Sequence, residues 1–190
     1  MNNKAFDIIL AGVGGQGIIT LLSIIDEAVF IEGNEIRSSE LHGLSQRGGS
    51  VEAHIRFGKD VYSPLISYSK ADLIIGLEKL EGLRMALYAN SETKFLINDH
   101  LLPFVGILSS DEITKKLKDI ASDNLYLISA SEICQKELEK EVVSGIYLLG
   151  YAAYKNLLPI KPESFLKAIG KLIPEKYLEL NKKAFELAKN

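Results

Sequence analysis

A glycine-rich segment near the amino terminus has the spacing of an anion-binding turn. Gly12, Gly14 and Gly17 follow a short apolar run and precede a stretch with helical periodicity, in the pattern Gly-x-Gly-x-x-Gly. Glycine lets the backbone approach a ligand, and the free N–H groups and dipole at the start of a helix favour an anion. Gly15 and Gln16 complete the turn, which we expect to hold a phosphate-bearing ligand or the backbone of a partner protein.

This glycine spacing does not by itself identify the ligand. Nicotinamide- and flavin-binding proteins carry an acidic residue about 20 residues after the glycines, where it binds the ribose hydroxyls. Glu40 is the candidate for that role. A P-loop is excluded, because no Gly-Lys-Ser/Thr sequence follows the glycines. The alternative is that the glycines only permit close packing of a strand against a helix.

A second polar segment, residues 38–50, collects glycines, hydroxyls, amides, one histidine and one arginine. It follows the second predicted strand, at the sheet edge where open α/β sheets bind ligands. Arginine suits the recognition of phosphate or carboxylate, and paired glycines allow unusual backbone angles. A solvated loop would explain the same composition. The candidate ligand-binding residues of this segment are Glu40, His42, Ser45, Gln46, Arg47, Gly48 and Gly49.

The sequence offers no catalytic residue and no metal ligand. His42 and His54 fall on different predicted elements with no cysteine nearby, so we expect ordinary polar histidines. Ser45 lies three residues from His42 without a glycine elbow around it, which does not favour a hydrolase. Cys134 is the single cysteine; alone it cannot form a disulfide, a Cys-rich zinc site or an iron–sulfur cluster within the chain. We expect Cys134 to be buried in a helix.

Length and charge narrow the class of protein further. A chain of 190 residues is about one domain. Its 22 Lys and Arg against 25 Asp and Glu leave a net charge of −3, which predicts neither a nucleic-acid nor a membrane partner. The longest apolar stretch, residues 146–154, is far shorter than the ~20 residues of a membrane-spanning helix. A charged residue interrupts the start of the chain, which does not read as a signal peptide, so we expect a cytoplasmic protein.

Hydrophobic periodicity predicts an α/β fold. Residues 5–11 have the apolar character of a buried parallel strand, and residues 18–29 repeat apolar positions on one helix face up to a stop near Gly33. Residues 35–40 form a short second strand, so the order is that of a right-handed βαβ unit.

The next segment changes to a period of two. Residues 51–57 alternate apolar and polar side chains, and Gly58-Lys59 has the form of a two-residue turn. Residues 60–63 would then form the second strand of the hairpin, which Pro64 ends. This pattern predicts an antiparallel hairpin inserted in the sheet, which would therefore be mixed.

The remainder alternates short apolar strands and helices, and then becomes helical. We predict strands at residues 72–76, 94–98 and 125–128, and helices at residues 80–87, 111–121 (capped by Asp111), 142–154, 165–172 and 175–189. The fold class is thus a three-layer α/β/α Rossmann-like sandwich with a mostly parallel, mixed sheet, an antiparallel hairpin and a helical carboxyl end. One domain is expected to span residues 1–190.

Several segments, taken together, resemble one protein family. They are residues 12–18, 39–51, 61–66, 71–78 and 179–185, so the resemblance covers essentially the whole chain. The family is that of the γ-type subunits or domains of 2-oxoacid:ferredoxin oxidoreductases, which includes pyruvate and ketoisovalerate members. The form of residues 42–49 most resembles the indolepyruvate branch, whose small subunit is called beta.

The resemblance implies that the chemistry belongs to a larger, alpha subunit. Members decarboxylate a 2-oxoacid on thiamine diphosphate, pass two electrons through iron–sulfur clusters to ferredoxin, and release an acyl-coenzyme A. Thiamine diphosphate, its Mg ion and the [4Fe-4S] clusters are then expected in the partner, and coenzyme A as co-substrate. The glycine turn and residues 45–49 would face the partner's thiamine site or the coenzyme A path, with Arg47 contacting a carboxylate or phosphate.

Other interpretations stay open at this stage. The chain could serve a pyruvate, 2-oxoglutarate or ketoisovalerate oxidoreductase, or be a free-standing nucleotide- or dinucleotide-binding module that uses Gly12, Gly14, Gly17 and Glu40. The apolar stretch 142–154 is a candidate docking face for a partner, although core packing explains it equally well.

Overall fold

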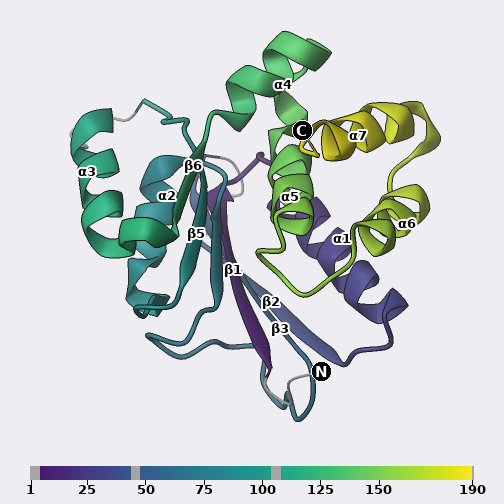
Figure 1. Ribbon diagram of the computed structural model, residues 1–190, viewed down its shortest axis with the longest axis horizontal. Helices are drawn as coiled ribbons and strands as arrows, with labels where there is room; N and C mark the ends of the chain where they lie inside the picture. The colour runs from purple at the N-terminus through teal and green to yellow at the C-terminus, as the bar shows by residue number, and fades with distance from the viewer. Residues whose placement is uncertain (1–4, 44–47, 104–107, 190) are drawn as a thin grey trace.

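The computed structural model describes residues 5–43, 48–103 and 108–189. In this part of the chain a six-stranded sheet, with strand order β2-β3-β1-β4-β5-β6, lies between two layers of helices (Figure 1). Only β3 runs against its neighbours, so the sheet is mixed and mostly parallel, as expected. The strands are β1 (Phe6–Val13), β2 (Ile36–His42), β3 (Ser50–Phe57), β4 (Leu73–Gly76), β5 (Lys94–Asn98) and β6 (Leu125–Ile128).

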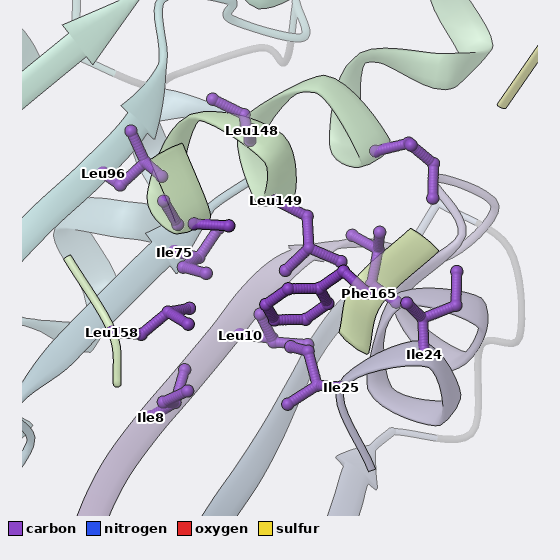
Figure 2. Packing of buried hydrophobic residues seen from close by; sticks show 14 of the residues in the cluster. Ile8, Leu10, Ile24, Ile25, Ile75, Leu96, Leu148, Leu149, Leu158 and Phe165 are labelled. Carbon is purple, nitrogen blue, oxygen red and sulfur yellow. The ribbon is translucent and has the colours of Figure 1, made fainter. Parts of the chain in front are cut away.

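The central strand β1 is buried on both faces, because its side chains alternate between two hydrophobic cores. Ile8 and Leu10 belong to the larger core, and Ile9 and Ala11 to the smaller one. Figure 2 shows the larger core, where side chains from β1 meet those from helices on the same face. The helices of that face are α1 (Ile18–Ile31), α4 (Ala130–Leu138), α5 (Ser144–Tyr154), α6 (Pro162–Leu172) and α7 (Glu175–Leu187).

The opposite face carries α2 (Lys79–Arg84), its 3-10 continuation η1 (Met85–Tyr88) and α3 (Ser110–Ala121). The N-cap residue of α3 is Ser109, whose hydroxyl accepts from the Glu112 N–H, while the Glu112 carboxylate accepts from the Ser109 N–H. The predicted cap Asp111 is therefore wrong: it lies inside the first turn, and the Ser-x-x-Glu spacing of a capping box marks the true start.

The helix α5 is part of the core rather than a free docking face. It packs against α1, α4, α6 and α7, and most of its side chains are buried. Its contact with α7 is close: a Cβ on Gly150 would lie 2.2 Å from the Phe185 carbonyl oxygen. The apolar stretch that ends at Tyr154 is thus explained by packing within the chain.

Two predictions about strand pairing are corrected. The strand β2 runs parallel to β1, as in a βαβ unit, but β3 lies between them. The hairpin is formed by β2 and β3, and residues 60–63 are not a strand. The physical reason is that both edges of β3 are already paired: Phe57 lies opposite Phe6 on one side and Ile36 on the other. No edge remains for the returning segment.

The remaining elements follow the predicted pattern within a few residues. The strand β5 spans Lys94–Asn98 and β6 spans Leu125–Ile128, both as expected, and α7 ends at Leu187. Among the helices described, none is long and apolar enough to cross a membrane.

Candidate functional site

The two glycine-bearing segments lie in contact. The Gly14 N–H donates to the Gly49 carbonyl at 2.8 Å, and the Gly48 N–H donates to the Gly14 carbonyl at 3.2 Å. They meet because β1 and β3 are paired up to Val13 and Ser50, so the chain leaving β1 passes the chain entering β3. The turn and residues 48–50 therefore form one structural unit at the carboxyl end of β1.

The glycines of the turn have different roles. Gly15 and Gly17 have φ angles of 107° and 83°, in the region that side chains with a Cβ rarely adopt. Gly12 is instead required by packing, because a Cβ there would lie 2.8 Å from Gln16 Oε1 and 3.1 Å from Leu77 Cβ. The expected close packing of strand and helix thus explains Gly12, whereas the turn conformation explains the other two.

Gln16 closes the turn on itself. Its Oε1 atom accepts from the Val13 N–H at 2.7 Å, and its own N–H donates to the Val13 carbonyl at 3.0 Å. The side chain is thereby engaged inside the turn, where it stabilises the backbone conformation that Gly15 and Gly17 allow.

The start of α1 has the features of an anion site. Gly17 is the N-cap residue, no side chain of the described residues caps the helix, and the first turn contains no acidic residue. Gly15, Gly17 and Thr20 are exposed. Free N–H groups and the positive end of the helix dipole are thus open to a ligand.

An open cavity of about 560 Å³ adjoins this helix start. The glycine turn and the first turn of α1 form one wall, and Glu40, His42 and Val51 of the hairpin form the other. His42 Nδ1 lies 2.9 Å from the Gly43 carbonyl, which can only accept, so Nδ1 carries the hydrogen. His42 Nε2 lies 4.0 Å from Glu40 Oε1. The cavity thus joins amide donors on one wall to a carboxylate and an imidazole on the other.

A second cavity, of about 510 Å³, lies on the other side of the turn. It shares Gly15, Gly17 and Thr20 with the first cavity, and its far wall comes from α5, α7 and the residues that join α6 to α7. Tyr177 and Asn181 line it, and neither was predicted from the sequence. Tyr177 and Asn181 come close to the turn because α7 packs on α5. The amphipathic pattern of α7 predicts which face of the helix is buried, but it does not predict which elements that face contacts.

A buried carboxylate network supports the hairpin from the other side. The Ser50 hydroxyl donates to Glu81 Oε2 at 2.5 Å, and Arg84 Nη1 donates to Glu81 Oε1 at 2.6 Å. Glu78 accepts from the Leu80 and Glu81 N–H groups, and burial raises the pKa of the Glu78 carboxyl above its usual value. The network links α2 to the residue that follows Gly49. Sequence reasoning missed it, because Ser50 and Glu81 are 31 residues apart in the chain and only the fold brings them together.

The two histidines do not share a site. Register places His42 opposite Val51, and His54 opposite Ser39, on the other face of the hairpin. The structure describes no group of three or more His, Cys, Asp or Glu that could hold a metal ion. Cys134 is buried in α4, as expected, and burial raises the pKa of its thiol to about 11.

The predicted site residues therefore divide into three sets. The hydrogen bonds and the first cavity bring together Gly14, Gly15, Gly17, Glu40, His42, Gly48 and Gly49. Gly12 and Gln16 shape the turn from within. Ser45, Gln46 and Arg47 lie outside the described residues and remain predictions from the sequence.

Comparisons with known proteins match nearly the whole chain. The family model described as pyruvate ferredoxin/flavodoxin oxidoreductase matches residues 7–190. Indolepyruvate oxidoreductase subunit IorB from Thermococcus kodakarensis is 31% identical over 190 residues, which is 97% of this chain and 94% of the relative.

Solved structures share the fold. Pyruvate oxidoreductase subunit PORC from Thermotoga maritima has a TM-score of 0.72 at 19% identity, over 98% of this chain and 96% of that chain. A 2-oxoglutarate:ferredoxin oxidoreductase from Magnetococcus marinus, with 2-oxoglutarate, coenzyme A and succinyl-CoA bound, has a TM-score of 0.74 at 20% identity. That match covers 99% of this chain but 31% of that one.

Proposed function

The chain belongs to the pyruvate ferredoxin/flavodoxin oxidoreductase family, and we propose that it is the small, γ-type subunit of an indolepyruvate:ferredoxin oxidoreductase. The complex would oxidatively decarboxylate an aryl pyruvate to an acyl-coenzyme A. One structural observation carries the proposal. Gly14 is hydrogen-bonded to Gly48 and Gly49, and these residues lie beside an open cavity. The cavity adjoins the start of α1, where no side chain of the described residues caps the helix. Residues 1–190 would form one γ-type domain that works in the cytoplasm.

The reactive centres would lie in a larger partner subunit. Thiamine diphosphate with its Mg ion would supply the decarboxylation chemistry there, and [4Fe-4S] clusters would supply the electron transfer to ferredoxin. A four-iron cluster takes four thiolate ligands, whereas this chain has one cysteine, and it is buried. The donor set of the chain therefore does not fit a cluster, which supports a partner that holds it. We expect the isolated chain to be inactive.

The residues of this chain would bind and orient an anionic co-substrate. The open N–H groups at the start of α1 suit a phosphate. The volume of the adjoining cavity matches a ligand of the size of coenzyme A better than a small anion. Glu40 can accept from a hydroxyl, and Arg47 would add a positive charge to the same edge. A coenzyme A complex of the similarly folded Magnetococcus protein supports this class of ligand.

A second candidate function is a free-standing dinucleotide-binding module. It is favoured by Glu40, which lies in the same cavity as the glycine turn, where an acidic residue can bind ribose hydroxyls. Calorimetry of the isolated chain with NAD, FAD, ATP and coenzyme A distinguishes the two. Tight binding of NAD or FAD without a partner would favour this module over the oxidoreductase subunit.

The main proposal is tested by co-purification from the native source and by reconstitution. We expect a larger subunit with thiamine diphosphate and iron–sulfur clusters to co-purify, and the pair to reduce ferredoxin with indolepyruvate and coenzyme A. Turnover with pyruvate, 2-oxoglutarate and ketoisovalerate measures the substrate preference. Decarboxylation by the isolated chain, or native purification without any such partner, would contradict the proposal.

A further inference from the structure

A third cavity, of about 440 Å³, lies on the sheet face opposite the glycine turn. On this face α2 and α3 pack on β1, β4, β5 and β6, so the hairpin is covered by the irregular segment that follows β3. Leu41 and His54 reach the cavity from the hairpin, Leu65 and Tyr68 from the irregular segment, and Tyr88 from η1. The proposed function uses none of these residues.

His54 forms the buried wall of this cavity. Only 2% of the residue is exposed, and its Nδ1 atom accepts from the Ile66 N–H at 3.0 Å. The hydrogen of the neutral ring is therefore on Nε2. This buried atom has no hydrogen-bond partner among the described residues, although Glu52 Oε1 lies 3.5 Å away. Burial lowers the pKa of His54 below its ordinary value of 6.5, and the nearby Glu52 carboxylate opposes this shift without overcoming it, so the neutral ring predominates at pH 7.

The charge of Glu52 is consequently not balanced by His54. Its carboxylate accepts a long hydrogen bond, of 3.5 Å, from the neutral Tyr88 hydroxyl. No lysine or arginine in the described ranges forms an ion pair with it. The Glu52 side chain is 24% exposed, so it is reachable from outside yet partly removed from water. A carboxylate in that position gains most from a cation brought to it.

The cavity is also lined by aromatic and aliphatic surface. The Tyr68 and Tyr88 rings lie 5.4 Å apart between centroids, and Tyr88 meets His54 edge-on at 5.0 Å. Tyr68 and Leu65 are 68% and 53% exposed. Tyrosine faces attract a lysine or arginine head group, while the aliphatic stem of such a side chain packs on leucine.

We propose that this cavity receives a lysine or arginine side chain of the larger subunit, with Glu52 as counter-ion and Tyr68 and Tyr88 as the aromatic platform. The inference rests on the proposed function, since it assigns the docking surface of that complex. Charge complementarity selects the occupant: the cavity is lined by an uncharged imidazole and two tyrosine rings, and the Glu52 carboxylate, which has no cation among the described residues, lies beside it, 3.5 Å from both the Tyr88 hydroxyl and His54 Nε2. His54 acts as a positioning residue, because it ties the segment at Ile66 to the hairpin.

The test measures the dissociation constant between this chain and the larger subunit from the same source. Glu52→Gln keeps the shape and removes the charge, and we expect it to weaken the complex by about tenfold or more. The matched control is Glu179→Gln, an exposed carboxylate on α7 that carries the same charge change. The control should bind within about twofold of wild type.

A second pair of variants tests the aromatic platform. Tyr68→Ala should weaken the complex several-fold, and Tyr68→Phe, which keeps the ring, should restore it. Thermal unfolding of each isolated variant shows whether it is folded. Wild-type affinity of Glu52→Gln or of Tyr68→Ala would overturn the docking surface and leave the proposed function intact. A wild-type chain that does not bind the larger subunit at all would overturn both.

Discussion

The Ser50 hydroxyl donates a hydrogen bond to the buried carboxylate of Glu81, which links α2 to the second glycine segment. Ser50 follows Gly49 directly, and Gly49 accepts from the N–H of Gly14. The Glu81 carboxylate, on the α2 side of the sheet, is thus connected through Ser50 and Gly49 to the glycine turn that precedes α1. The site is held from both faces of the sheet.

This relationship predicts the effect of Glu81→Ala. The substitution leaves the Ser50 hydroxyl without its acceptor and Arg84 without its counter-ion, which should lower the free energy of unfolding by about 1–3 kcal/mol. Urea unfolding measures it, and coenzyme A binding to the reconstituted complex should weaken as the loop loosens. Glu81→Gln, which keeps an acceptor, should recover part of both losses. Unchanged stability of Glu81→Ala would show that the network does not support the loop.

Gly12 and Gly170 give a matched pair of glycine substitutions. Gly12→Ala should lower the free energy of unfolding by about 1–3 kcal/mol, because the new Cβ meets Gln16, Ile18 and Leu77. Gly170 lies in α6 with nothing within 4 Å of a Cβ, so Gly170→Ala should be stabilising by about 0.5–1 kcal/mol. Thermal unfolding compares the two. Equal effects would mean that the side chains around Gly12 move to accommodate a Cβ, so that close approach does not require glycine there.

The carboxyl of Asp26 predicts a pH dependence of stability. Its Oδ1 atom is buried with no hydrogen-bond partner in the part of the chain that the structure describes, and Oδ2 accepts from the Ser38 hydroxyl at 2.6 Å. Burial raises the pKa of the Asp26 carboxyl in the folded state. A raised carboxyl pKa means that the folded state binds the proton more tightly than the unfolded state, so ionisation at neutral pH costs stability. Asp26→Asn should therefore be more stable than wild type at pH 7.

The advantage of Asp26→Asn should shrink as the pH falls through the raised pKa, and it should vanish below the ordinary value of 3.8. Urea unfolding at pH 7 and at acidic pH measures the difference. A difference that stays constant across this range would attribute the effect to packing instead.

Arg47→Ala tests the predicted role of the polar loop. In the reconstituted complex we expect turnover to fall and the KM for coenzyme A to rise by roughly 10–100-fold, because an ionic hydrogen bond of about 1.5–3 kcal/mol is lost. Assembly with the larger subunit should be unaffected. Arg37→Ala is the control: Arg37 is an exposed arginine of β2 that donates to the Ile36 carbonyl. Identical kinetics for both variants would remove Arg47 from the site.

Local pattern accounts for most of the elements. Apolar residues at helical spacing predict α1, and short apolar runs predict β1, β5 and β6, because these signals depend on neighbours within a few residues. The hairpin could not be predicted in the same way. Residues 51–57 have the alternation of a half-buried strand, but alternation does not reveal which strand is the partner, and a Gly-Lys turn signal suggested the wrong one.

The site shows the same division. Gly14, Gly48 and Gly49 could be singled out by type and spacing, because a sharp backbone turn needs glycine. Glu81, Tyr177 and Asn181 could not, because a carboxylate, a tyrosine and an amide on helices are ordinary residues until packing brings them to the turn.

By itself, the sequence of this protein determined most of the helices and strands, the two candidate segments and the family resemblance, since each depends on residue type and short spacing. The tertiary structure alone decided that β3 lies between β1 and β2, so that Gly14 meets Gly49. It also decided that Glu52 lies 3.5 Å from the buried His54, with no lysine or arginine of the described ranges paired to it. Such contacts join residues distant in sequence, and only the burial of the whole apolar surface selects among the possible pairings.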